Sequence, residues 1–160
     1  GYDHVFYTGP LDAYFNFKHG RLGYRTVTFE AHYAKGDYQG LSQMNFCDEE
    51  VPYTRIAEHK HFTPWEQHEE TIYFKEFSKE TEETDIPYYP KRLETDKELL
   101  KKYRHEAETL TNVSFLGRLA TYRYMDMHHV IGEALQFADE FLKASATGGK
   151  KPVFSNVENF

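Results

Sequence analysis

The middle of the chain alternates apolar and polar residues with a period of two, the pattern of half-buried β-strands. Every second residue is apolar across residues 26–33. Shorter segments with comparable alternation lie at residues 43–46, 55–59 and 71–77. Because the connections between these segments contain turn chemistry such as Lys-Gly-Asp at 35–37, they predict a four-stranded antiparallel sheet with one face in solvent.

The two ends of the chain combine strands with helical spacing. Residues 4–8 predict a buried strand and residues 11–18 a helix. Residues 96–110 predict an amphipathic helix, and residues 113–116 a short strand. The apolar residues between 127 and 142 recur every three to four positions, which is the cleanest helical pattern in the chain.

Three further segments lack such periodicity. Residues 79–85 are predicted to form a charged, solvated loop, and residues 87–90, bracketed by prolines, an extended segment. Residues 145–160 contain Gly-Gly and no period, and are predicted to form a loose tail. The order of elements indicates an α/β (α+β) fold, in which an antiparallel sheet is inserted between two parts of an α/β domain.

Length and composition narrow the class of protein. The chain has 160 residues and a formal net charge of −7, which argues against a nucleic-acid partner because phosphates need a basic surface. The apolar runs are too short for a transmembrane helix, and the N-terminus carries no secretion signal, so we expect a cytoplasmic protein without a membrane partner. The single Cys47 excludes an internal disulfide.

Aromatic residues are abundant, with 13 Tyr and 13 Phe. A tyrosine ring combines a flat apolar face with a polar hydroxyl, which suits sugars, nucleobases and flavins. The same residues suit an ordinary sheet core, so this composition does not by itself choose a ligand.

The histidines do not predict a metal site. His59 and His61 fall on one face of a predicted strand, but no third ligand is visible nearby. His128 and His129 are adjacent on a predicted helix and therefore diverge. We interpret all four as solvated or hydrogen-bonded side chains.

The connection at 117–127 joins a predicted strand to the last long helix. A helix N-terminus presents free N–H groups to an anion such as a pyrophosphate, and Arg118 and Arg123 could add charge-assisted contacts. Asp126 is placed to cap the helix, although Asp is a common N-cap residue in helices that bind no ligand. The other candidates for ligand contact are Arg25, Arg55 and the Tyr88–Tyr89 pair, although an exposed ion pair is the more common role of an arginine on a strand.

Six segments in one order resemble UDP-galactopyranose mutases, a family of bacterial flavoenzymes. They include Pro-Tyr-Thr-Arg at 52–55 and Pro-Tyr-Tyr-Pro at 87–90. The six segments are residues 5–12, 20–25, 51–56, 58–62, 87–90 and 117–127. The resemblance covers about residues 4–143 and corresponds to the C-terminal half of those enzymes.

The resemblance implies the chemistry. The family interconverts UDP-galactopyranose and UDP-galactofuranose for cell-surface polysaccharide biosynthesis, using reduced FAD and a covalent intermediate between flavin N5 and the sugar. The resemblance also implies a domain division, in which residues 1–24 belong to an FAD-binding domain and residues 25–92 form a substrate-binding sheet domain. Residues 93–145 would return to the FAD-binding domain, and residues 146–160 would be a tail.

The resemblance also implies the roles of individual residues. Arg55 matches an arginine on the substrate diphosphate, and Tyr124 is implied beside it as a second catalytic residue. The residues implied for substrate binding are Arg25, Asn45, Arg55, Tyr89 and Tyr124. Arg118 is implied on the FAD pyrophosphate. The stretch beside the flavin is implied to be Met125, Asp126, Met127, His128, His129 and Val130, the two histidines through their backbone groups only.

The Gly-x-Gly-x-x-Gly fingerprint of a dinucleotide-binding fold is not in this sequence, although the family carries it in its N-terminal half. We therefore expect a fragment that is inactive alone, does not retain FAD and lacks the N-terminal half as its partner; a homodimer stays open. Two alternatives stay open as well. One is a non-catalytic UDP-sugar or nucleotide-binding module, and the other is a different flavoenzyme of the amine-oxidase-like group.

Overall fold

The computed structural model describes residues 1–155. The chain divides into two compact units. The α/β unit consists of Gly1–Tyr24 together with the chain from Pro87 onward, and the sheet unit consists of Arg25–Ile86. This division and the sheet order confirm the predicted insertion of an antiparallel sheet into an α/β fold.

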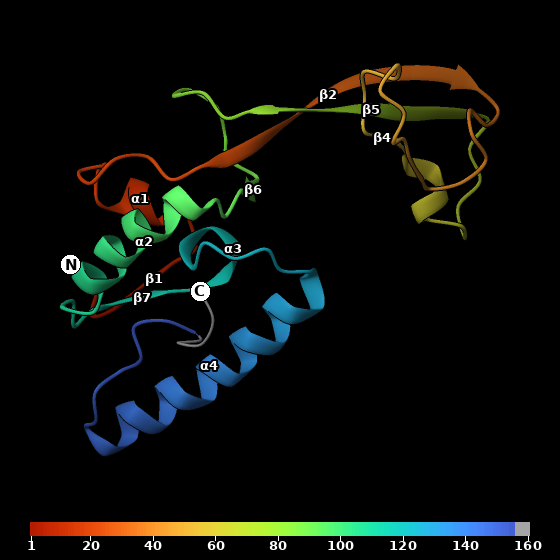
Figure 1. Ribbon diagram of the computed structural model, residues 1–160. Helices are drawn as coiled ribbons and strands as arrows, with labels where there is room; N and C mark the ends of the chain where they lie inside the picture. Colours follow the sequence, from red (N-terminus) through yellow and green to blue (C-terminus); the bar gives the residue numbers. More distant parts are fainter. Residues whose placement is uncertain (156–160) are drawn as a thin grey trace. The chain divides into compact units, whose positions relative to one another are not determined.

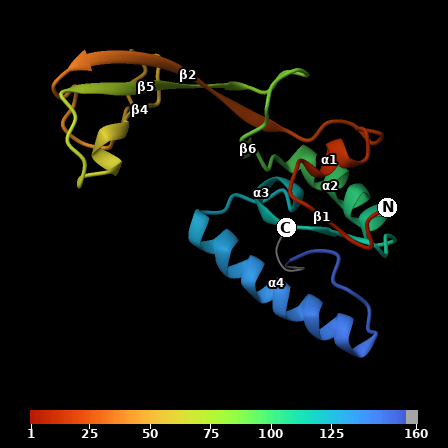
Figure 2. The same cartoon turned by 180° about the vertical axis from the view of Figure 1, so that it is seen from behind.

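The α/β unit is built around two short parallel strands. β1 (Val5–Tyr7) pairs with β7 (Val113–Phe115), so that Val5 lies opposite Val113. Figures 1 and 2 show this ladder between the helices α2 (Glu94–Ala107) and α4 (Met127–Thr147). Because strand side chains alternate, Phe6 turns to α4 and meets Phe137 and Phe141, whereas its neighbours turn to the other side.

The main core of this unit lies on that other side. Aromatic and aliphatic side chains from β7, from α2 and from the connection after β7 are buried there, and Val5 and Tyr7 of β1 pack against them. The core residues are Leu11, Leu22, Tyr24, Leu100, Tyr103, Ala107, Val113, Phe115, Ala120, Tyr122 and Phe154. This core fixes the segment that carries several of the expected cofactor residues.

Short elements complete the α/β unit. They are α1 (Leu11–Tyr14), β6 (Tyr89–Pro90) and α3 (Gly117–Ala120). The helix predicted for residues 11–18 is shorter than expected, because Asn16 and Phe17 adopt positive φ angles of 51° and 56° that end it. The strand-to-helix turn after β7 uses Gly117 at a φ of 78°, a conformation that costs glycine little.

Two expectations about the end of the chain are wrong. α4 continues to Thr147 and ends at Gly148 in the left-handed region, so the helix is longer than its sequence pattern suggested. The following residues are not loose, because Phe154 forms a bridge with Phe115 and is buried. The rest of the predicted tail, residues 156–160, lies outside the described residues.

The apolar pattern of α4 does not correspond to a buried face. Phe137 is buried, but Ile131, Leu135 and Leu142 are 61%, 66% and 64% exposed. The periodicity correctly predicted a helix, but the side chains that define it are not covered by the described part of this chain. Within residues 1–155, no helix is both long and apolar enough to cross a lipid bilayer.

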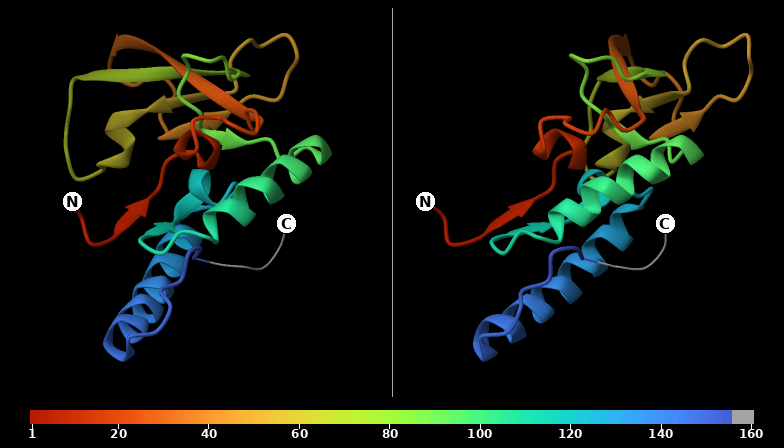
Figure 3. Two further views of the ribbon diagram at one scale, coloured as in Figure 1. Left: turned by 90° about the vertical axis from the view of Figure 1, so that its left-hand side faces the viewer. Right: turned by 60° about the vertical axis from the view of Figure 1, so that its left-hand side comes forward.

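The sheet unit contains four antiparallel strands in the order β3-β4-β5-β2. β2 (Tyr24–Lys35) and β5 (Glu70–Glu80) form the longest strand pair, visible in Figure 3 as orange and yellow-green ribbons. β4 (Arg55–Glu58) pairs with the other edge of β5, and β3 (Gln43–Asn45) pairs with β4. The four predicted antiparallel strands are present, but the sheet has a fifth strand, β6, next to β2.

Two local predictions in this unit are wrong. β5 continues to Glu80, so the charged segment at 79–85 begins inside a strand and is tied back by the Lys79–Asp85 ion pair at 2.8 Å. His59 and His61 are not on a strand, because β4 gives way to the 3-10 helix η1 (His59–Phe62). The two histidines therefore do not share a strand face.

Candidate functional site

The sheet unit brings three of the expected substrate-binding residues onto one face. Asn45 of β3 lies directly opposite Arg55 of β4, and Arg55 lies opposite Glu76 of β5. Arg25 of β2 lies opposite Glu80, four residues along the same strand β5. Since opposed residues and residues two apart share a face, these side chains all project from the same side of the sheet.

Arg55 is held by Asn45 and Glu76, and the amide of Gln43 on β3 also faces its guanidinium. Its Nε donates a hydrogen bond of 2.9 Å to Oδ1 of Asn45, and its Nη1 lies 3.5 Å from Oε2 of Glu76. About a third of the Arg55 side chain remains exposed. The contacts with Asn45 and Glu76 orient the guanidinium, while the side chain stays partly accessible from solvent.

Arg25 is held in a similar way. Its Nη1 donates to Oε1 of Glu80 at 2.8 Å, and its Nε and Nη2 donate to Oγ of Ser78 at 3.1 and 3.0 Å. The face therefore carries two guanidinium groups, each with an acidic neighbour on β5. These neighbours keep the face close to electrical neutrality when no anion is bound.

The acidic neighbours are residues that the sequence interpretation missed. Glu76 lies within a segment that was predicted as a strand, so its presence on the sheet was foreseeable. Its position beside Arg55 depends on the register between β4 and β5. No tight turn joins these two strands, so the sequence does not specify that register.

In the α/β unit, Arg118 lies against two tyrosine rings. Its guanidinium carbon is 4.5 Å from the ring centre of Tyr89 and 5.2 Å from that of Tyr124. The two rings are 5.9 Å apart and nearly parallel, at 22°. The structure thus brings together one expected cofactor residue and two expected substrate residues, through cation–π contacts.

Backbone carbonyls complete the setting of Arg118. Its Nη1 donates to the carbonyl of Met125 at 3.3 Å and its Nη2 to the carbonyl of Tyr88 at 3.1 Å. These bonds use two of the five N–H donors of a guanidinium. Tyr124 is 61% exposed, so the cluster opens to solvent on that side.

The stretch from Asp126 to Val130 forms the exposed N-terminus of α4. The Asp126 side chain makes no capping hydrogen bond in the described structure, contrary to the expectation that it would cap the helix. The N–H of Val130 is bonded to the Asp126 carbonyl at 3.1 Å, whereas the earlier N–H groups of the first turn have no such intrahelical partner. This end of the helix has the donors and the positive dipole that suit an anion.

The side chains of this stretch are mostly in solvent. Met127, His128 and His129 are exposed, and Nδ1 of His129 lies 3.9 Å from Oδ2 of Asp126. Met125 is buried and offers its carbonyl to Arg118. The structure therefore gathers Met125 with the Arg118 cluster and leaves the two histidine rings outside it.

Arg123 has a structural role, which corrects the expectation that it contacts an anion. Both of its terminal nitrogens pair with the carboxylate of Glu133 on α4, one of them at 2.8 Å. The same carboxylate accepts a hydrogen bond of 3.2 Å from Oγ of Ser155. This pairing ties the connection after α3 to the helix and occupies the forked donor set of Arg123.

Comparison with known proteins identifies the family. The family model described as "UDP-galactopyranose mutase" matches residues 1–124. The chain belongs to the UDP-galactopyranose mutase family. Residues 125–160, which include most of α4, lie beyond the part that this model matches.

Curated relatives agree with this family. A protein of Klebsiella pneumoniae described as "Probable UDP-galactopyranose mutase" is 54% identical over 154 residues, which cover 96% of this chain and 40% of that protein. The dTDP-fucopyranose mutase of Escherichia coli is 48% identical over 143 residues, covering 89% of this chain and 38% of that protein. The chain thus spans about 40% of the length of these relatives.

A solved structure shows the same fold. A crystal structure of reduced UDP-galactopyranose mutase superimposes with a TM-score of 0.68 at 13% sequence identity. The superposition covers 96% of this chain and 46% of the solved chain. At this level of identity the likeness concerns the fold, and it extends over both units of this member of the UDP-galactopyranose mutase family.

Proposed function

We propose that this chain is the C-terminal portion of an isomerase that interconverts UDP-galactopyranose and UDP-galactofuranose. The observation that carries the proposal is the shared sheet face of Arg25, Asn45 and Arg55 in a chain of this family. The resemblance assigns these three residues to the substrate, and the strand register of this chain puts them on one face of the sheet, with Asn45 directly opposite Arg55. A UDP-sugar carries a diphosphate, the group that a pair of guanidinium groups suits.

In this proposal Arg55 is a catalytic residue. Its Nε and Nη1 are directed to Asn45 and Glu76, and its Nη2 is the donor that we assign to the β-phosphate of the substrate. Negative charge grows on that phosphate as UDP leaves the sugar, so a fixed cation stabilises the transition state more than the ground state. Glu76 and Asn45 hold the guanidinium in place before the charge develops.

Tyr89 and Tyr124 are proposed to bind the substrate through their hydroxyl groups. Their stacked rings rest on the Arg118 guanidinium, which restricts the directions in which the hydroxyls can point. A tyrosine loses little conformational entropy on binding because it has only two side-chain torsions. Tyr88, whose carbonyl anchors Arg118, supports this arrangement from the backbone.

The residues of the α/β unit fit part of an FAD site. Arg118 and the uncapped N-terminus of α4 together offer N–H donors and positive charge, the chemistry that a pyrophosphate requires. We assign Arg118 to the pyrophosphate and the backbone of 125–130 to the neighbourhood of the flavin. Reduced FAD, when bound, supplies the nucleophile of the reaction.

The remaining partners belong to the complete enzyme. We propose that FAD retention requires the N-terminal part that the relatives possess beyond the span of this chain. We further propose that the complete enzyme acts in the cytoplasm and supplies galactofuranose for cell-surface polysaccharides.

A second candidate substrate has specific support. The Escherichia coli relative at 48% identity is named for dTDP-fucopyranose, which differs from the UDP-galactose substrate in both the base and the sugar. A diphosphate is common to both compounds, so the arginine face fits either. The arginine face therefore does not distinguish the two nucleotide sugars, and an assay is needed to identify the substrate.

The test is a turnover assay on the complete enzyme containing this chain. Enzyme reduced with dithionite is incubated separately with UDP-galactofuranose and dTDP-fucofuranose, and the nucleotide sugars are separated chromatographically. We expect conversion of UDP-galactofuranose to the pyranose by reduced enzyme and not by oxidised enzyme. Conversion of the dTDP-sugar alone would establish the second candidate, and failure to convert either by flavin-loaded enzyme would overturn the proposal.

A further inference from the structure

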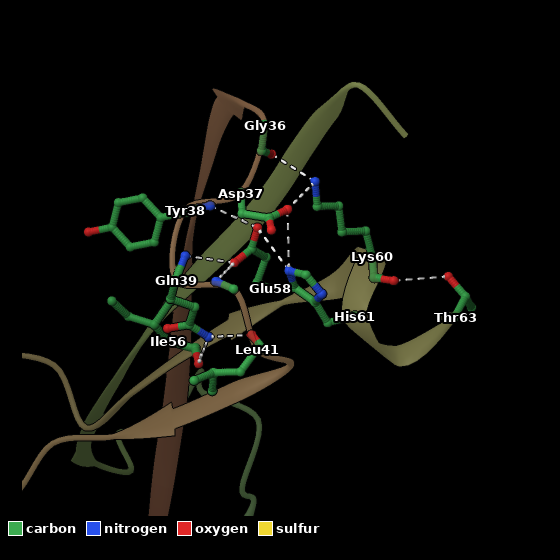
Figure 4. A network of polar contacts seen from close by, with 11 residues as sticks. Gly36, Asp37, Tyr38, Gln39, Leu41, Ile56, Glu58, Lys60, His61 and Thr63 are labelled. Atoms are coloured by element: carbon green, nitrogen blue, oxygen red, sulfur yellow. Dashed lines mark hydrogen bonds and ion pairs between the residues drawn. The ribbon is translucent and has the colours of Figure 1, made fainter. Parts of the chain in front are cut away.

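Three side chains with metal-binding groups meet at one end of the sheet unit, where β2 and β4 end. Asp37 follows β2 in the turn, Glu58 is the last residue of β4, and His61 lies in η1. Figure 4 shows the two carboxylates and the imidazole directed at a common point. Their nearest ligand atoms all lie within 4.8 Å of one another.

The separations match those around a bound ion better than those of hydrogen bonds. His61 Nε2 is 3.5 Å from Oε1 of Glu58 and 3.6 Å from Oδ1 of Asp37. Hydrogen bonds between such atoms are typically about 2.7–3.2 Å. Ligands at about 2.1 Å from a tetrahedral Zn²⁺ lie roughly 3.4 Å from each other.

The imidazole nitrogen that faces the carboxylates is unsatisfied. Nε2 of His61 is buried and has no hydrogen-bond partner among the described residues. A buried polar atom without a partner costs free energy, on the order of 1–3 kcal/mol. A metal ion at the common point would satisfy this nitrogen and both carboxylates at once.

Glu58 is fixed as a carboxylate. Its side chain is fully buried and accepts hydrogen bonds from the backbone N–H groups of Tyr38, Gln39 and Gly40 at 2.9, 2.8 and 3.1 Å. Oε1 takes one of these bonds, which leaves a lone pair directed toward His61. The site thus has one ligand that is both ionised and held in place before any ion arrives.

Lys60 competes with a metal ion for Asp37. Its Nζ is 2.5 Å from Oδ1 of Asp37 and also donates to the carbonyl of Gly36 at 2.8 Å. The ammonium therefore neutralises the carboxylate in the absence of an ion. Because the Gly36 carbonyl can retain Lys60, binding of a divalent cation requires only the contact with Asp37 to be exchanged.

A polar cavity gives access to the cluster. It has a volume of about 660 Å³ and is lined in part by Asp37, His61, Glu66, His68 and Glu69. This space admits water molecules, so an ion in the cluster could complete its coordination with water.

We propose that Asp37, Glu58 and His61 form a site for a divalent metal ion, Zn²⁺ in the first instance, with water as the remaining ligand. A neutral imidazole with two carboxylates is a donor set that Zn²⁺ accepts in tetrahedral geometry. The bound ion links the turn after β2 to the end of β4 and to η1. The site is independent of the diphosphate-binding residues and of the cofactor.

The test is zinc binding by the complete enzyme that contains this chain, stripped with EDTA and titrated with ZnCl₂ in a calorimeter near neutral pH. We expect one Zn²⁺ at this site. His61→Gln and Asp37→Asn should each weaken the affinity for Zn²⁺ at least about tenfold. Changes to residues that only support a metal ligand typically lower affinity about 10–100-fold, and loss of a ligand itself should cost no less. Circular dichroism of each variant establishes that the fold is retained.

Matched variants separate the site from other histidines. His68→Gln, in the same cavity, and His128→Gln, in the exposed cluster with Asp126 and His129, should leave this affinity unchanged. Lys60→Gln should tighten binding, an effect that partial unfolding cannot produce. Absence of zinc binding, binding that His61→Gln does not weaken, or weaker binding in Lys60→Gln would each overturn the proposal.

Discussion

The Tyr122 hydroxyl donates a hydrogen bond of 2.7 Å to the Asp96 carboxylate, and both side chains are buried. The same hydroxyl lies 2.6 Å from the carbonyl of Gly23. Burial, reinforced by the nearby Asp96 carboxylate, raises the pKa of Tyr122, so the phenol stays protonated and remains a donor. This contact joins α2 to the connection between α3 and α4, which carries Tyr124 and Met125.

Tyr122→Phe should therefore destabilise the α/β unit. Removing the hydroxyl leaves the buried Asp96 carboxylate without this donor, at a cost of about 1–3 kcal/mol in the free energy of unfolding. Urea unfolding followed by circular dichroism measures the change. Tyr2→Phe is the matched control, since Tyr2 is 89% exposed and its hydroxyl should contribute little. Equal stability of the two variants would contradict the assigned role.

Glu58 should make the sheet unit sensitive to acid. Burial alone would raise the pKa of Glu58, but the backbone N–H groups of residues 38–40 outweigh burial and lower the pKa from 4.5 to about 2. A depressed native pKa contributes stability above pH 4.5, and that contribution is lost as the pH falls toward 2. The contribution at neutral pH is about 3 kcal/mol.

The corresponding measurement compares wild type with Glu58→Gln across this pH range. Urea unfolding monitored by the fluorescence of Trp65, in the same unit, should show the variant to be less stable at neutral pH. The difference should shrink as the pH is lowered from 4.5 to about 2, because wild type then loses its charge. A difference that is constant with pH would show that the carboxylate charge is not the cause.

Arg55→Ala in the complete enzyme should reduce turnover strongly while the fold and the FAD content are kept. Loss of one fixed donor to a developing negative charge typically lowers the rate by about 10²–10³. Arg55→Lys should recover only part of the rate, because an ammonium lacks the planar set of donors. Steady-state kinetics with reduced enzyme provide the measurement.

The rival interpretation of Arg55 is a structural ion pair with Glu76, worth roughly 0–1 kcal/mol. On that interpretation Arg55→Ala and Glu76→Gln would have equal and small effects on turnover. On the catalytic interpretation Glu76→Gln retains much more activity than Arg55→Ala, because the guanidinium is still present. Turnover of Arg55→Ala within a few-fold of wild type would refute the catalytic assignment.

Arg118→Ala should lower the FAD content of the complete enzyme more than its affinity for the nucleotide sugar. The guanidinium is assigned to the pyrophosphate, where charge-assisted hydrogen bonds are the strong contacts. Flavin absorbance per protein and a separate UDP-binding titration measure the two effects. Arg123→Ala is the matched control. Because Arg123 is paired with Glu133, this substitution should lower the stability of the fold more than the FAD content. Full flavin content in Arg118→Ala would give Arg118 a structural role.

Local patterns in the sequence predicted much of the fold. Alternation identified the long strands, and three-to-four spacing identified α2 and α4, because each pattern reflects the geometry of a single element. The pattern of α4 overestimated burial, since its outer apolar residues are not covered by the described chain. The tail was mispredicted because the contact of Phe154 with Phe115 has no local signature.

The candidate sites depended more on tertiary structure. Family resemblance pointed to Arg55, but the position of Glu76 beside it follows from strand register alone. The proposed zinc site was hidden because its ligands come from a turn, a strand end and a 3-10 helix. The sequence interpretation placed His61 on a strand with His59, and that geometry obscured its proximity to Asp37 and Glu58.

The continuity of one unit and the discontinuity of the other affect the order in which they can form during synthesis. Residues 25–86 are contiguous, so every strand partner of β5 has been made once β5 emerges from the ribosome. The α/β unit instead depends on contacts such as that of His4 with Ser114, 110 residues apart. Contacts between residues so far apart in the sequence form late. The sheet unit can therefore fold on the nascent chain before β7 has been synthesised and can pair with β1.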